Sequence, residues 1–177
     1  MEIPGLGSVT EHPDIDGWLR SEKIPVKVLG GKACRFIVEG YVEDPCKEEF
    51  HAAIQNFLAL DPSALTDAQE HVFAYFKDRQ NDLWQPDDPE YLVIASPADV
   101  WKHVRLGSEP MVSRRHYGDQ GIYISLECGC DWEEEHGLQI VFKNGQRVNK
   151  VGPYDGHLTN SDAYGEEELE DVVYRQL

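Results

Sequence analysis

The sequence predicts an α+β fold: an antiparallel sheet built from N-terminal and C-terminal strands, with a central helical hairpin packed on it. Three observations lead to this prediction. Two β-rich runs flank Gly30-Gly31, two amphipathic helical stripes fill the middle of the chain, and strand patterns return from Met111 onward. Because strands and helices are segregated along the chain, α+β is favoured over a doubly wound arrangement.

The length and composition are those of one globular domain. The chain has 177 residues, of which 41% are hydrophobic and 28% are charged, enough to close a hydrophobic core. We expect residues 1–177 to form a single domain. Its expected parts are a β-rich region (1–44), the helical hairpin (45–80), a surface loop (81–90), strands with a short helix (91–160) and an acidic tail (161–177).

The first predicted element is a β-hairpin. Residues 24–29 and 33–38 are rich in β-formers and flank Gly30-Gly31, a combination typical of two strands joined by a tight turn. Pro25 cannot donate a ladder hydrogen bond, so it predicts a sheet edge or a strand start for the first strand.

Two helices are predicted next. Asp44-Pro45 is a helix-start signal, with a capping side chain followed by a proline suited to the first turn. A second start follows at Asp61-Pro62. Apolar residues then recur at helical spacing in two stripes: Phe50, Ala53, Ile54, Phe57 and Leu58, then Leu65, Ala68, Val72, Phe73 and Phe76. So short a break between them predicts a helical hairpin.

The rest of the chain returns to strands. Tyr91–Ala95 is a compact β-forming run, and Ser96-Pro97 begins a short helix through Val104. Residues 122–127 alternate between apolar and polar, as in a half-buried antiparallel strand. Asn144-Gly145 is a strong hairpin signal, because a type I′ turn needs positive φ at both positions.

The Asn144-Gly145 hairpin gathers a polar cluster at its open end. A two-residue turn pairs Lys143 with Gln146 and Leu138 with Val151. Continuing that register outward brings six candidate binding residues together: Trp132, Glu135, His136, Tyr154, Asp155 and His157.

This cluster has three possible roles. The first is recognition of a polar ligand. The second is a transition-metal or general-base site built on His136, Asp155 and His157, with Glu135 and either Cys128 or Cys130 as further ligands. The third is purely architectural. No nucleophile elbow, phosphate-binding loop or His-Glu-x-x-His pattern accompanies the cluster, which weakens the catalytic role.

The net charge indicates which kinds of macromolecule the protein is expected to bind. Acidic residues number 33 against 16 basic ones, giving −17. A nucleic-acid binder needs a basic footprint, and an anionic membrane surface attracts basic segments, so we expect neither partner. An acidic surface suits a basic protein, whose approach it accelerates electrostatically.

The chain is expected to be cytoplasmic. Residues 1–7 lack the basic and apolar regions of a secretory signal, and no apolar run approaches the roughly 20 residues that span a bilayer. The four cysteines, at positions 34, 46, 128 and 130, are too few and too unevenly spaced for a disulfide framework.

Two C-terminal segments resemble an uncharacterised bacterial family, a domain of unknown function. They are Trp132-Glu133-Glu134-Glu135-His136-Gly137-Leu138 and Val151-Gly152-Pro153-Tyr154-Asp155-Gly156-His157-Leu158-Thr159. The likeness runs nearly end to end and implies membership, but it carries no activity. Small acidic domains of this type are associated with bacterial toxin–immunity genes.

The leading functional hypothesis is a non-enzymatic cytosolic binding module without a cofactor, immunity-like towards a basic protein. The rival hypothesis is a metal-dependent enzyme that uses the His136, Asp155 and His157 site. A third is a purely structural domain of a larger assembly.

Overall fold

The computed structural model describes residues 1–83, 85–88 and 91–176. Within these ranges one sheet of nine strands has the order β1-β2-β3-β4-β6-β7-β8-β9, with β5 paired to β7. The pairing of β4 with β6 is parallel, and the other pairings are antiparallel. The strands are β1 (Glu2–Ile3), β2 (Gly7–Glu11), β3 (Trp18–Val26), β4 (Lys32–Glu39), β5 (Val104–Arg105), β6 (Met111–Arg114), β7 (Ile122–Cys130), β8 (Glu133–Lys143) and β9 (Arg147–Gly152).

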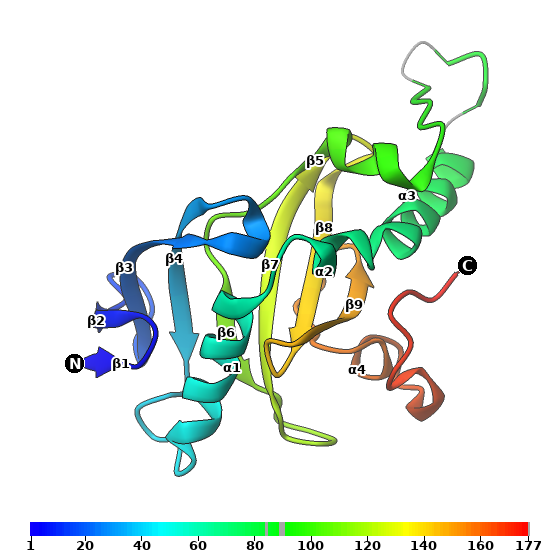
Figure 1. Ribbon diagram of the computed structural model, residues 1–177. Helices are drawn as coiled ribbons and strands as arrows, with labels where there is room; N and C mark the ends of the chain where they lie inside the picture. The colour runs from blue at the N-terminus through cyan, green and yellow to red at the C-terminus, as the bar shows by residue number, and fades with distance from the viewer. Residues whose placement is uncertain (84, 89–90, 177) are drawn as a thin grey trace.

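Helices α1 and α3 cover one face of this sheet (Figure 1). The helical elements are η1 (Lys27–Leu29), α1 (Lys47–Ala59), α2 (Ser63–Thr66), α3 (Gln69–Leu83), η2 (Pro97–His103), α4 (Asn160–Tyr164) and η3 (Glu167–Leu169). The fold is therefore mixed, with a mostly antiparallel sheet, as the sequence predicts. The packed helical hairpin is not confirmed, because α1 lies over β6 and β7 whereas α3 lies against β9 and η2. None of the helices in the described ranges is long and apolar enough to cross a membrane.

The hydrophobic core lies between these helices and the sheet. Phe57 of α1 packs edge-on against Phe36 and Phe142, with ring centroids 6.0 and 5.0 Å apart. Trp132 meets Tyr75 and Phe76 of α3 at 6.1 and 5.8 Å. The apolar stripes of both helices thus form the core, since aromatic pairs at these distances add to the free energy gained by burying area.

The opposite side of the sheet, which we call the polar face, carries side chains of a different kind. Successive residues of a strand point to opposite faces, so Ile124 and Leu126 enter the core while Tyr123 and Ser125 point to the polar face. Five polar residues of this face are buried: Ser113, Arg115, Ser125, Gln139 and Lys150.

Arg115 anchors the C-terminal segment across part of the polar face. Its guanidinium donates to both carboxylate oxygens of Asp162, at 2.7 and 2.8 Å, and of Glu170, at 2.5 and 2.9 Å. Farther along, the Val151 amide donates to the Val173 carbonyl at 2.7 Å, so the segment also lies along β9. The predicted acidic tail (161–177) is therefore partly fixed to the sheet.

Three local predictions about the middle of the chain differ from the structure. No strand forms over 91–95; the Leu92 carbonyl instead accepts a hydrogen bond from the Gln80 side chain of α3. Helix α1 begins at Lys47 and not at residue 45, and the Asp44 carboxylate accepts hydrogen bonds from both the Cys46 amide, at 2.8 Å, and Arg114, at 2.6 Å. Ser96-Pro97 does begin a helix, but it is a 3₁₀-helix.

The first hairpin is confirmed, and η1 forms the connection between β3 and β4. Pro25 lies in β3, which has neighbours on both sides, but β2 pairs only with residues 19–21 of that strand. The Pro25 backbone is therefore at a local edge, where the missing N–H leaves no ladder bond unmade.

The Asn144-Gly145 turn forms with the predicted backbone but a different register. Both residues have positive φ, 52° and 65°. Lys143 nevertheless pairs with Arg147 rather than Gln146, and a bulge between Val141 and Phe142 adds a further shift. Val151 therefore lies opposite Ile140 and not Leu138, because a bulge inserts one unpaired residue into one strand.

Substituting Arg115 tests the anchoring of the C-terminal segment. We expect Arg115→Met to lower the free energy of unfolding in urea by about 3–5 kcal/mol, because it leaves two partly buried carboxylates unpaired. Arg147→Met is the matched control. It removes an exposed pair with Asp171 at 3.0 Å, and such pairs contribute about 0–1 kcal/mol. Equal losses in the two variants would contradict the anchoring.

Low pH should weaken the ion pairs that Arg115 forms with Asp162 and Glu170. The Arg115 hydrogen bonds lower the pKa of Glu170; for Asp162, burial raises the pKa, but Arg115 outweighs it and the net shift is downward. Carboxylates with lowered pKa stabilise the fold above their unfolded values, about 3.9–4.3, and lose that contribution as pH falls through the folded values. The stability difference between wild type and Arg115→Met should therefore narrow in urea titrations below about pH 4.5. A constant difference from neutral pH to about pH 3 would argue against the ion pairs.

Candidate functional site

Three of the six predicted site residues line one cavity. Glu135, His136 and Tyr154 border a cavity of about 530 Å³ on the polar face. The Tyr154 amide donates to the His136 carbonyl at 3.1 Å, which joins the start of β8 to the chain that follows β9. This contact brings His136 and Tyr154 together at the base of the hairpin, in a register different from the predicted one.

The other three predicted residues do not line this cavity. Trp132 is fully buried in the core. Asp155 accepts a 2.5 Å hydrogen bond from Lys150 and a 2.8 Å bond from the His157 amide. The His157 carbonyl also accepts from Lys150, at 3.3 Å. Asp155 and His157 therefore position the loop after β9 and are not cavity walls.

Lys150 is the centre of that arrangement. It is 1% exposed, and burial lowers its pKa, while its contact with Asp155 favours the charged form. Its ammonium also donates to Gln139 at 2.7 Å, and Gln139 donates to Ser125 at 2.9 Å. This chain of hydrogen bonds connects the loop that carries Tyr154 to Ser125 in the cavity floor.

The proposed metal ligands are not assembled. In the described part of the chain, no three His, Cys, Asp or Glu side chains form a group that could hold a metal ion. Asp155 is paired with Lys150, while His136 has Glu133 as its neighbour, with Nδ1 and Oε1 3.7 Å apart. The geometry therefore gives the metal-enzyme hypothesis no support.

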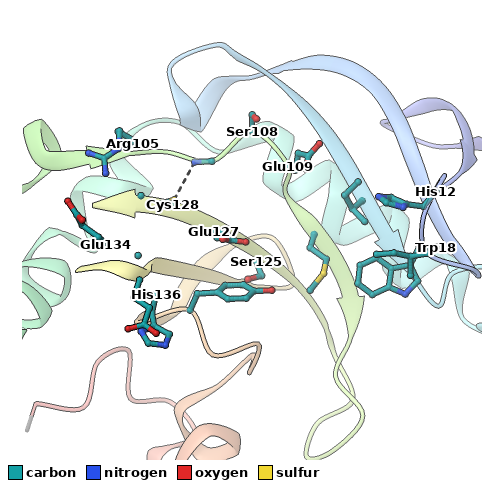
Figure 2. A pocket seen from close by; sticks show the side chains of 18 residues that line it. His12, Trp18, Arg105, Ser108, Glu109, Ser125, Glu127, Cys128, Glu134 and His136 are labelled. Atoms are coloured by element: carbon teal, nitrogen blue, oxygen red, sulfur yellow. Dashed lines mark hydrogen bonds between the residues drawn. The ribbon is translucent and has the colours of Figure 1, made fainter. Parts of the chain in front are cut away.

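The two neighbouring thiols do not act as ready ligands. Burial raises the pKa of Cys128 to about 11 and that of Cys130 to about 12. Both sulfurs are hydrogen-bonded within the protein: Cys128 accepts from the Gly107 amide at 3.4 Å, and Cys130 donates to the Glu133 carbonyl at 3.6 Å. The Cys128 contact is drawn in Figure 2.

Besides Ile37 of β4, Arg105 of β5 and Met111 of β6, the cavity is built from four separate parts of the sequence (Figure 2). Strand β7 gives the floor, with Ser125 and Glu127, and the β5–β6 connection gives Ser108 and Glu109. The third part is the hairpin base described above. The fourth is N-terminal: His12 and Trp18 come from the region around β2 and β3 and lie at the end of the cavity remote from Arg105 and Glu134.

The charge of this cavity is unbalanced. Four glutamates line it: Glu109, Glu127, Glu134 and Glu135. Their carboxylates make no hydrogen bond or ion pair with any residue in the described ranges. Arg105, the cation of the lining, is itself paired with Asp131. All four glutamate side chains are exposed to solvent, and an acidic recess with unpaired carboxylates attracts cations.

The sequence contains a signal for part of this lining, but the prediction of the six site residues did not include it. The alternation over 122–127 already sets Ser125 and Glu127 on the same face, opposite the core. No comparable signal points to Trp18 or His12. They reach the cavity because β4 pairs in parallel with β6, the strand that lies next to β7.

A protein family described as "Domain of unknown function (DUF6985)" matches residues 5–158 of the chain. The chain belongs to this family. The match includes every residue of the cavity lining and confirms the predicted membership of an uncharacterised domain family. No curated protein and no solved structure matches the chain.

Whether the Trp132 side chain belongs to the hydrophobic core or to a binding site can be tested by substitution. We expect Trp132→Ala to lower the free energy of unfolding by about 3–5 kcal/mol, because it leaves a large void beside Tyr75 and Phe76. Urea unfolding followed by circular dichroism measures this. Tyr117→Ala is the control, since Tyr117 is 77% exposed and such a change costs within about 0.5 kcal/mol. A Trp132→Ala protein as stable as the control would show that the side chain is not part of the core.

Proposed function

We propose that this protein is a non-enzymatic, cytosolic binding module that receives a basic segment of another protein in the cavity of the polar face. The observation that carries the proposal is the set of four glutamates in that cavity without partners in the described chain. Cationic side chains are the complementary chemistry, because they neutralise carboxylates that the protein itself leaves unpaired.

The overall charge supports the same partner. A net charge of −17 steers a basic protein towards the surface and repels acidic competitors. The cavity then adds a specific contact to this general attraction. In its finer form, the proposal is an immunity-like role, in which the module masks a basic partner protein by occupying one of its exposed segments.

The size of the cavity fits a segment and not a whole protein face. About 530 Å³ lies within the range of sites that enclose a small ligand, so it accepts a few side chains. The remaining contact would come from the acidic surface around it, whose contribution weakens as salt screens the charges.

Charge-matched variants test the proposal. The double variant Glu109→Gln/Glu127→Gln removes two cavity charges, and Glu48→Gln/Glu70→Gln removes two exposed charges of α1 and α3. Immobilised proteins would capture basic proteins from the source cell at low and high salt. We expect the cavity variant to bind the captured partner roughly tenfold or more weakly, and the control less than about threefold, since both lose the same net charge.

The control defines how the proposal fails. Equal weakening by both double variants would show that only net charge matters and that the cavity is not the site. Capture of no basic protein by the wild type, or binding that is indifferent to salt, would contradict the basic partner itself.

A further inference from the structure

The cavity has two chemically different ends. Arg105 and Glu134 lie at one end, Trp18 and His12 lie at the other, and Glu127 lies between the two ends on the β7 floor (Figure 2). Between them, the floor near Trp18 is apolar, formed by Ile37 and Met111. A ligand that fills the cavity therefore meets carboxylates and apolar side chains together.

The strand ladder fixes the separation of Glu127 from the apolar part of the floor. Ile37 pairs with Met111, and Met111 pairs with Ser125. Glu127 follows Ser125 by two residues on the same face of β7, so it is the diagonal neighbour of Met111. Such diagonal neighbours lie about 7–8 Å apart. An extended peptide repeats its side chains on one side at nearly the same interval, roughly 6.6 Å for residues i and i+2.

The surroundings of Glu127 favour a guanidinium over an ammonium. Glu127 and Tyr154 both line the cavity. Glu127 pairs with Gln139, which in turn pairs with Gly152, two residues before Tyr154, so the ladder brings the two side chains to the same region of the polar face. A guanidinium is planar, so it pairs with a carboxylate through two hydrogen bonds and stacks on an aromatic ring. An ammonium offers a point charge alone.

Resting on the proposed function, we infer that the cavity recognises an extended peptide segment in which an arginine and a large apolar residue are two positions apart. The arginine pairs with Glu127 beside Tyr154, and the apolar side chain packs on Met111, Ile37 and Trp18. The intervening residue points away from the floor, because side chains of an extended chain alternate.

Blocked tripeptides of identical composition test this spacing. The probes are acetyl-Arg-Ser-Leu-amide and acetyl-Leu-Ser-Arg-amide, which hold Arg and Leu on one side in either chain direction, and acetyl-Arg-Leu-Ser-amide, which does not. Acetyl-Lys-Ser-Leu-amide tests the guanidinium. Titration into ¹⁵N-labelled protein would follow the amide signals of Ser125 and Glu127 and the indole N–H of Trp18.

We expect at least one of the two spaced peptides to bind roughly tenfold more tightly than the scrambled one, because only a spaced peptide buries the leucine. The affinity of this spaced peptide should exceed that of the lysine peptide several-fold. Met111→Ala should abolish the preference for spacing, and Glu127→Gln the preference for arginine. Tyr117→Ala and Glu48→Gln are the matched controls that should leave both preferences intact, and circular dichroism confirms that each variant is folded.

The possible failures are distinguishable. If all the arginine peptides bind at the cavity with equal affinity, the spacing inference is overturned and the proposed function stands. If no cationic peptide shifts the cavity signals, both fail. If the preference survives Met111→Ala and Glu127→Gln, recognition lies elsewhere and the inference is wrong.

Discussion

A buried guanidinium on the polar face constrains the rest of the structure. Arg115 is buried in the sheet and must be paired, since an unpaired charge at such a position is strongly destabilising. Asp162 and Glu170 supply the pairing from the C-terminal segment. They draw that segment over one part of the polar face, and the cavity occupies another part that the segment does not close. The place of the cavity on the polar face thus depends on where Arg115 anchors the C-terminal segment.

Two adjacent arginines hold the layers of this fold together. Arg114 closes β6 and points towards α1, where it binds Asp44 and Glu49 at 2.6 Å each. Arg115 follows it and points to the polar face. Because successive side chains alternate, one dipeptide fixes a helix on one side of the sheet and the C-terminal segment on the other. The sequence showed this basic pair but not its distant partners Asp44, Asp162 and Glu170, which lie 47 to 70 residues away.

Local chemistry predicted most elements of the fold. Apolar spacing identified α1 and α3, alternation identified β7, and the need for positive φ identified the Asn144-Gly145 turn. The register of that hairpin could not be predicted, because a single bulged residue shifts the pairing and nothing in the local sequence marks the bulge. Likewise, the compact run 91–95 has strand-forming residues but pairs with no strand in the described part of the chain, and Leu92 instead accepts a hydrogen bond from Gln80 of α3.

The candidate site was predictable only in part, for a similar reason. Glu135, His136 and Tyr154 were found from one hairpin, a contact between near neighbours in sequence. Trp132 was misplaced because a large apolar ring near polar residues has the same local signature in a core and in a binding site. The lining residues from β3, β4 and the β5–β6 connection depend on parallel pairing between distant strands, which residue patterns do not encode.

The Asn144-Gly145 turn bears on how the helical layer can evolve and be engineered. A Cβ atom at Gly145 would lie 2.0 Å from the Ala53 carbonyl oxygen, and the Asn56 side chain donates to the Asn144 carbonyl at 3.0 Å. The loop tip is therefore pressed against the backbone of α1 and is not a free surface turn. Insertions are usually tolerated at loop tips, but here an added residue or fused tag would push the helix off the sheet.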